Sequence, residues 1–540
     1  MLGFNLVDKT GLTWLKGRPL VASITSVCGT AFLLFGYDQG VMSGVVISKH
    51  WLNTMDDPSA ALIGGISGLY DVGAVIGAIL AAFTAENIGR KRGLMLGAVA
   101  LIVGSVLMGA AYEKGAFIVG RIFTGIGIGY FTSVAPVYQS EICLPSQRGW
   151  LLCCQLTCLL VGILLSYWIN YGMYYLSGGF TWRFPLAFQI VFALYMLAVT
   201  PWLPETPRWL ILHEPTPERG LLVLSKLRNK AIDDPAVQKE KDDIVRATAL
   251  EAEAEGSWGD LFRDNNCSGH KRFLLAAGSQ FMQQTSGINI VTYYAPTIFQ
   301  STLGMSQERS LLVGGFLQVW YLLASFLTWW LIDAVGRRRL FIIFAIGMAL
   351  VLVGEAITVH DGSYAAGIVA AGFVFLFEGC FTWGWMTTSW VYPSEILPLK
   401  LRAKGNGMAA AANYLGNFIV VMITPPALEN IGYKLYIIFA VFNTVAAIIC
   451  WMFYPETSGL PLEAIDELFV SADNAQAPGT RNPWYNKYKW SVIERSKAAV
   501  AKAKRDRREA SKMGDKDEEK ISDDLSLPNG KDASHVEFSH

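Results

Sequence analysis

The sequence VYQSEI at residues 137–142 returns as VYPSEI at residues 391–396, 254 positions further along the chain. Each copy follows a long apolar stretch. Two further segments repeat in the same order and at nearly the same spacing, namely GRKR at 89–92 with GRRR at 336–339, and PET at 204–206 with PET at 455–457. The chain therefore contains two related halves that carry the same three short polar motifs.

The composition places both halves in a lipid bilayer. Of the 540 residues, 52% are hydrophobic and only 16% are charged, whereas a typical soluble domain has about 25% charged residues. The charges are clustered, which leaves stretches of roughly 20 apolar residues, long enough to cross about 30 Å of hydrocarbon. Backbone polar groups in lipid must bond within a helix. We therefore predict an all-α integral membrane fold with twelve transmembrane helices in two pseudo-symmetric six-helix bundles.

The order of the segments follows from where the apolar stretches begin and end. We expect a cytoplasmic N-terminus over 1–19, a first six-helix bundle over 20–206, cytoplasmic linker helices over 207–270, a second bundle over 271–456, and a cytoplasmic, largely disordered tail over 457–540. Lysine and arginine gather in the loops on the side that both termini share. The positive-inside rule therefore places both termini in the cytoplasm.

Several classes of function are excluded by what the chain lacks. The net charge is zero, and its six histidines form no pair at metal-ligand spacing. With no phosphate-binding glycine loop and no nucleophile–base pair, we expect no enzyme, no metal, no cofactor and no nucleic-acid partner. Two similar membrane halves that rock against each other are what alternating-access transport requires. The sequence thus predicts a carrier of a small molecule, functional as a monomer.

Two charged residues lie inside predicted spans. Asp38 falls near the end of the first span and Arg121 early in the fourth. These spans run in opposite directions, so both residues are expected at similar depth in the outer half of the membrane. Ionisable residues are costly there unless they face a cavity or pair with each other. We predict an Asp38–Arg121 pair that a proton on Asp38 would release; the alternative is that each merely caps a helix near the interface.

A run of amides and phenols occupies the predicted seventh span, over 273–300. Amides donate and accept hydrogen bonds together, which suits a polyhydroxyl ligand, although buried amides also join helices to one another. Aromatic side chains and further amides follow in the tenth and eleventh spans. The candidate substrate-binding residues are Gln283, Gln284, Asn289, Tyr293, Tyr294, Trp390, Asn413 and Asn417. Glu378 is a further acid within a span, with either a coupling role or a partner across the bundle.

The repeated polar motifs fall on the cytoplasmic rim, where acids and arginines alternate. We expect them to form a gate network that latches the two halves while the carrier faces outward, rather than to serve only as topology signals. Its predicted members are Arg90, Glu141, Arg148 and Glu205 in the first half, and Arg337, Glu395, Arg402 and Glu456 in the second.

The motifs GYDQG at 36–40, PETPRWL at 204–210, QQTSGIN at 283–289 and PETSGLPLEAID at 455–466 resemble those of the sugar porter family of the major facilitator superfamily, in its fungal branch. The resemblance covers about residues 20–470. It implies a sugar contacted by Gln283, Gln284, Asn289, Trp390 and Asn417. It also implies that, in proton-coupled members, Asp38 and Arg121 form the coupling pair.

Four positions depart from the pattern of hexose carriers or differ among branches. Ile163 and Thr387 stand where some members have Gln and Pro, Tyr321 is similar to the fungal glycerol–proton symporters, and Asn170 is closer to the hexose carriers. The resemblance therefore implies a plasma-membrane sugar carrier, with sugar–proton symport as the expected mechanism. A passive facilitator, a polyol–proton symporter and a non-transporting nutrient sensor stay open as alternatives, and so do the substrates pentose, hexose, disaccharide and polyol.

Overall fold

The computed structural model describes residues 15–144, 148–214, 216–254, 269–301, 304–398 and 401–460, with short pieces at 465, 468–469, 492–493, 495–503 and 505. All regular structure in these residues is helical. The chain separates into two compact units, residues 1–454 and 455–540. Most of the predicted tail and part of the predicted linker, 255–268, lie outside the described residues.

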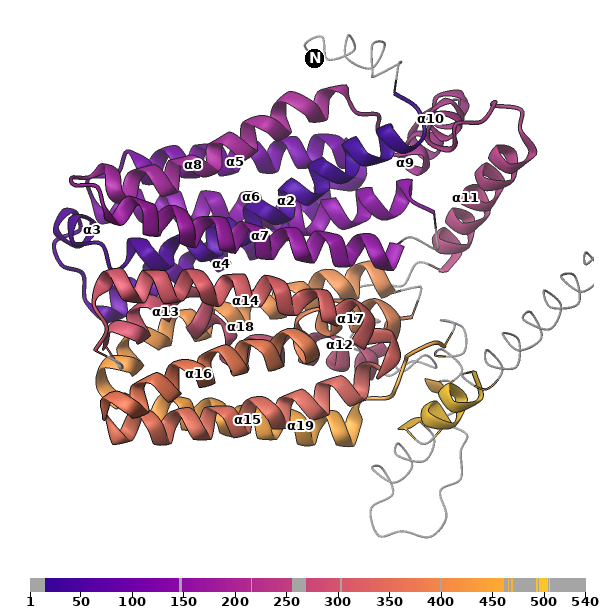
Figure 1. The fold of residues 1–540 in the computed structure, drawn as a ribbon. Coiled ribbons are helices and arrows are strands. Elements are labelled where there is room, and N and C mark those ends of the chain that lie inside the picture. The colour runs from indigo at the N-terminus through magenta and orange to yellow at the C-terminus, as the bar shows by residue number, and fades with distance from the viewer. Residues whose placement is uncertain are drawn as a thin grey trace, which may run out of the picture. The chain divides into compact units, whose positions relative to one another are not determined.

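The first half of the larger unit contains six long helices joined by short connections (Figure 1). Their apolar sequences favour helix because a helix satisfies its own backbone hydrogen bonds in lipid. Side-chain caps mark some of the boundaries; Ser59, for example, accepts a hydrogen bond from the Leu62 N–H at 3.4 Å. The six helices are α2 (Arg18–Val45), α4 (Ala60–Ile88), α5 (Arg90–Gly109), α6 (Lys114–Ile142), α7 (Arg148–Tyr174) and α8 (Phe180–Val199), with a short α3 (Lys49–Thr54) after α2.

The second half repeats this arrangement with two interrupted helices. A π-helical segment, Thr382–Met386, separates α16 from α17, and Gly287 separates α12 from α13. The helices of this half are α12 (Gly269–Thr285), α13 (Ile288–Ser301), α14 (Gln307–Ala334), α15 (Arg337–Asp361), α16 (Tyr364–Phe381), α17 (Thr388–Ile396), α18 (Arg402–Ile431) and α19 (Lys434–Phe453).

Eleven helices among the described residues are long and apolar enough to cross a membrane. The predicted seventh span, 273–300, is instead two shorter helices in series, because Gly287 adopts a φ of 101° that side-chain-bearing residues rarely adopt. Large apolar side chains such as Phe83, Trp330 and Leu350 are more than 60% exposed, as expected for surfaces that face lipid. The prediction of an all-helical membrane protein is confirmed.

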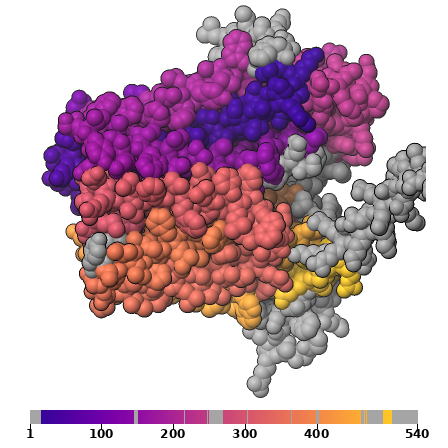
Figure 2. All heavy atoms as spheres, viewed as in Figure 1, coloured from indigo at the N-terminus to yellow at the C-terminus, as the bar shows by residue number. Residues whose placement is uncertain are grey.

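The two halves pack against each other along their helices (Figure 2). Glycines bring α4 and α18 close together, since a Cβ on Gly64 would lie 2.3 Å from the Met422 carbonyl oxygen. Two tyrosines also bridge the halves: the Tyr167 hydroxyl donates to the Thr292 carbonyl at 2.8 Å, and the hydroxyls of Tyr414 and Thr132 lie 2.7 Å apart. The interior between the halves is therefore lined with polar as well as apolar groups.

Three helices outside the membrane spans, α9 (Pro207–His213), α10 (Glu218–Arg228) and α11 (Pro235–Ala254), follow α8. They lie at the end of the first half where α2 begins and α6 ends. The Gly17 N–H donates to the Lys226 carbonyl at 2.7 Å, and Arg228 donates to the Ile142 carbonyl at 3.1 Å. The predicted linker segment is thus helical over its described part.

Candidate functional site

The structure joins Asp38 and Arg121 in the interior of the first half. Arg121 Nη1 lies 2.9 Å from Asp38 Oδ2, and both side chains are completely buried. Arg121 also donates to the Ser67 carbonyl at 3.1 Å, and its guanidinium carbon lies 4.8 Å from the ring centre of Tyr70. The predicted pairing is therefore present. Asp38 Oδ1 has no hydrogen-bond partner among the described residues.

Four of the predicted binding residues form one network of amides. Gln284 donates to Asn413 Oδ1 at 2.9 Å, Asn289 donates to Gln284 Oε1, and Asn413 donates to Gln283 Oε1 at 2.7 Å. Each of these side chains is at least 92% buried. Because every member both donates and accepts, a ligand hydroxyl could replace any of these contacts without leaving an unpaired group.

Sequence reasoning missed two features that hold this network in place. Gln280 accepts a second hydrogen bond from Asn413 Nδ2, at 2.6 Å; its position four residues before Gln284, on the same helix face, was the available signal. The second feature is the π-helical segment Thr382–Met386. Gln283 Nε2 donates to the Met386 carbonyl at 3.1 Å. A widened helical turn frees carbonyls in this way, and such turns are frequent at functional sites.

Asn417 does not join the amide network. Its Nδ2 donates instead to Asp71 Oδ1, at 2.8 Å, on α4 of the opposite half. The Tyr293 hydroxyl faces the Asn417 side chain and lies within electrostatic range of Asp71, and Asp71 Oδ2 has no hydrogen-bond partner among the described residues. Sequence reasoning did not consider Asp71, although a carboxylate within an apolar span was a signal of the kind used for Asp38.

The remaining predicted binding residues do not join the amide network. The Tyr294 hydroxyl donates to the Val421 carbonyl at 3.1 Å, and it also faces Ser67 of the first half and lies within electrostatic range of Asp71. Trp390 is half-buried on α17. Glu378 on α16 is fully buried, and neither of its carboxylate oxygens has a hydrogen-bond partner within the described part of the chain. The structure therefore does not supply the partner across the bundle that was one alternative for Glu378.

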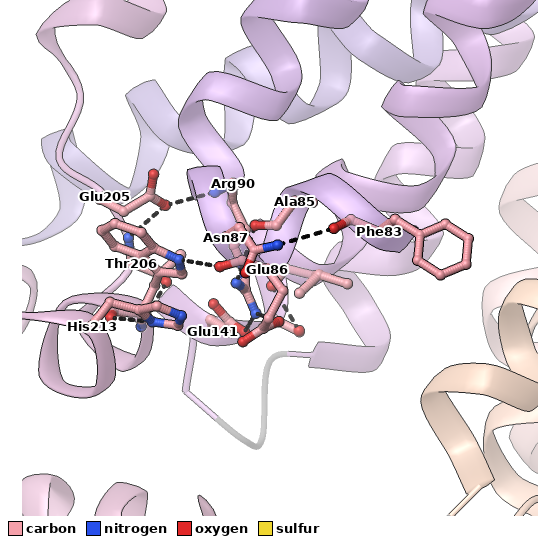
Figure 3. Close-up of polar contacts among 12 residues, drawn as sticks. Phe83, Ala85, Glu86, Asn87, Arg90, Glu141, Glu205, Thr206 and His213 are labelled. Atoms are coloured by element: carbon pink, nitrogen blue, oxygen red, sulfur yellow. Dashed lines mark hydrogen bonds and ion pairs between the residues drawn. The ribbon is translucent and has the colours of Figure 1, made fainter. Parts of the chain in front are cut away.

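Three of the four predicted gate residues of the first half, Arg90, Glu141 and Glu205, meet at the turn between α4 and α5 (Figure 3). Arg90 pairs with Glu141 at 3.0 Å and with Glu86 at 3.2 Å. Glu205 accepts hydrogen bonds at 3.1 Å from the backbone N–H groups of Arg90 and Lys91. The carboxylate thus lies at the positive end of the α5 dipole, where a negative charge is stabilised.

Glu205 also fixes the conformation of this turn. Gly89 adopts a φ of 91°, and a Cβ there would lie 2.4 Å from Glu205 Oε2, so only glycine fits. Burial raises the pKa of the Glu205 carboxyl above its ordinary value, while the N–H groups of Thr206, Lys91 and Arg90 oppose that rise. The contact ties the segment after α8 to the start of α5.

The second half repeats part of this arrangement. Arg337 pairs with Glu395 at 2.8 Å and with Asp333 at 2.8 Å, and Gly336 adopts a φ of 100° like its counterpart Gly89. Arg402 donates to the Leu397 carbonyl. Glu456 belongs to the smaller unit, where it accepts from the N–H groups of Thr457 and Ser458 at 3.1 and 3.2 Å.

These contacts differ from the expected latch between the halves. The Arg90–Glu141 pair joins helices of the first half, and the Arg337–Glu395 pair joins helices of the second. In each half the arginine after the glycine turn lies close to the glutamate of the repeated VYQSEI or VYPSEI segment of the same half. This proximity favours pairing within a half. The Arg148 side chain lies outside the described residues. A role of these residues in gating stays a prediction.

We expect Arg90→Gln to destabilise the first half. Glu141 would lose its partner while its side chain is only 9% exposed, and an unpaired buried charge costs about 3 kcal/mol. The measurement is the melting temperature of the detergent-solubilised, fluorescently tagged protein. Arg92→Gln is the matched control, because Arg92 is exposed two residues further along. Equal melting temperatures for the two variants would contradict the structural role of the pair.

Comparisons with known proteins identify the family of this chain. The family model described as "Sugar (and other) transporter" matches residues 21–469. A transporter named oryC from Aspergillus oryzae is 38% identical over 90% of this chain and 94% of its own length. The sugar transporter STL1 of Saccharomyces cerevisiae is 35% identical over 89% and 86%. The proton:xylose symporter XylE from E. coli, solved with 6-bromo-6-deoxy-D-glucose, has a TM-score of 0.68 and 28% identity over 84% of this chain and all of that one.

Proposed function

Because this chain belongs to the sugar transporter family of the major facilitator superfamily, we propose that it carries an uncharged sugar or polyol across the plasma membrane by alternating access, coupled to protons. Its membership of that family and its major facilitator fold are as the sequence predicted. Membership of this family also makes the chain a multi-pass membrane carrier and not an enzyme. The substrate, the coupling and the cytoplasmic position of both termini are parts of the proposal.

The observation that carries the proposal is the buried amide network among α12, α13 and α18. Four side chains that each donate and accept hydrogen bonds meet in the interior of a membrane protein, where unsatisfied polar groups are costly. Sugars and polyols present alternating hydroxyl donors and acceptors that match such a set. Proton coupling is supported by the buried Asp38–Arg121 pair and by the fact that XylE is a proton symporter.

The test is expression of the full chain in a yeast strain without hexose carriers, with growth and radiolabelled uptake measured on glucose, xylose, glycerol and a disaccharide. We expect uptake of at least one solute, abolished by a protonophore. Uptake that is insensitive to the protonophore would select the passive facilitator. No uptake of any solute, with the protein present at the cell surface, would contradict transport and favour the nutrient sensor.

A further inference from the structure

Asp71 is a buried carboxylate whose role the proposed function leaves open. It lies on α4 and is completely inaccessible. Its Oδ1 accepts a hydrogen bond from Asn417 Nδ2 at 2.8 Å, and its Oδ2 has no partner among the described residues. A buried carboxylate oxygen without a partner is costly. The cost is removed by a proton on that oxygen or by a donor that arrives from outside the protein, and the second case makes Asp71 a ligand-binding group.

Two further polar groups belong to the same cluster. The Tyr293 hydroxyl and the Asn417 side chain face each other, but the hydroxyl and Asn417 Oδ1 make no close hydrogen bond within the described residues, and both side chains are at least 99% buried. Asp71 also acts electrostatically on Tyr293. The cluster thus presents two acceptor oxygens and one hydroxyl, which is a complement for the hydroxyl groups of a solute.

The packing of the two halves creates this cluster. Gly64, Gly68 and Asp71 lie at i, i+4 and i+7, on one face of α4. The two glycines leave room for the α18 backbone at Met422 and the ring of Phe418. Asp71 from the first half is thereby brought against Asn417 from the second. A solute bound here would contact both halves, which is where an alternating-access carrier needs its ligand.

The local charge decides which solutes fit. Asp38 and Arg121 form a pair of opposite charges, and both act electrostatically on Asp71. The other titratable groups facing Asp71 are phenols, namely those of Tyr70, Tyr293, Tyr294 and Tyr414. When Asp71 is ionised, the three groups Asp38, Arg121 and Asp71 together carry one excess negative charge in a medium of low dielectric constant, where repulsion of a second negative charge is strong.

We propose that Asp71 is a binding and specificity-determining residue, whose carboxylate accepts a hydroxyl of a neutral polyhydroxy solute and excludes the corresponding hydroxy-acid anion. The assignment rests on the proposed function and narrows its substrate class. It extends the binding site, placed so far on the second half, to a helix of the first half.

The test compares matched neutral and anionic solutes in the full chain. Uptake of the neutral solute that the panel identifies is measured in the presence of its acid counterpart: gluconate against glucose, xylonate against xylose, or glycerate against glycerol. The variants are Asp71→Asn, which keeps shape and removes charge, and Asp71→Glu, which keeps charge. Asp242→Asn on α11, where the side chain is exposed, is the matched control. Rates are normalised to tagged protein at the cell surface.

We expect Asp71→Asn to raise the apparent KM for the neutral solute about tenfold, because the stronger acceptor is lost, and to let the anion inhibit at concentrations that do not affect the wild type. Asp71→Glu should still exclude the anion, and Asp242→Asn should match the wild type. Asp71→Ser removes the same charge and takes the place of Asp71→Asn if that variant does not reach the surface.

A KM within twofold of the wild type, or unchanged exclusion of the anion, would overturn the assignment. Either result leaves the proposed function intact if the wild type carries the neutral solute. A wild type that carries only the anion would refute both.

Discussion

Asp38→Asn is expected to abolish uphill accumulation of the solute, so that the internal concentration never exceeds the external one. A symporter must bind a proton at a group whose charge controls its conformation. Asparagine has nearly the shape of aspartate but cannot take up and release a proton. The variant should therefore equilibrate or exchange the solute across the membrane without concentrating it.

The geometry explains why this residue has such an effect. The side chains of Asp38 and Arg121 are both fully inaccessible, and Asp38 Oδ2 lies 2.9 Å from Arg121 Nη1. The attraction between them is therefore strongest when both groups are charged. A proton on Asp38 removes the attraction and frees Arg121. Besides Arg121, Asp38 faces the neutral side chain of Gln189, and its Oδ1 makes no close hydrogen bond among the described residues, so a proton can add there without breaking the contact with Arg121.

Accumulation and exchange are measured separately in cells or proteoliposomes, with and without an imposed proton gradient. The asparagine side-chain oxygen can still accept from Arg121 Nη1, so exchange reports that the variant is folded. Asp57→Asn is the matched control, because Asp57 is exposed in the loop after α3. Full accumulation by Asp38→Asn would remove Asp38 from the coupling role.

The Asp38–Arg121 pair was predictable because it depends on local features alone. Both residues are charged, both fall within apolar spans, and the direction of each span fixes the depth of its residue. That Gln283, Gln284 and Asn289 can face one cavity follows from their equally local spacing along the chain, whereas their contacts with Asn413 depend on how α12 and α18 pack. Helix periodicity and residue chemistry were sufficient for these positions.

The features that were missed depend on how helices from distant parts of the chain cross. Asp71 meets Asn417 only because α4 and α18 approach through glycines, and no spacing within either helix specifies that crossing. The pairing of Arg90 with Glu141 rather than across the halves likewise depends on the turn after α4. The π-helical segment before Thr387 has no unambiguous sequence signal, since its extra residue is accommodated by the surrounding helices.

Gln283→Ala is expected to weaken solute binding by about 1–3 kcal/mol, roughly a 5- to 150-fold rise in apparent KM. Gln283 holds two elements together: its Oε1 accepts from Asn413 at 2.7 Å, and its Nε2 donates to the Met386 carbonyl at 3.1 Å. Alanine removes both contacts, so the amide on α18 loses one acceptor and a carbonyl of the π-helical segment loses its donor.

The same uptake assay measures this effect. Gln238→Ala is the matched control, because it also removes a glutamine side chain but lies on α11, outside the membrane helices. Asn413 keeps its bond to Gln280 Oε1 at 2.6 Å, so the helices should stay in place. The loss should therefore fall on KM more than on the amount of protein at the surface. An unchanged KM at normal surface expression would place the solute elsewhere. The Gln283 side chain links α12, α18 and the π-helical segment, so its loss must change the affinity of a ligand bound among these amides.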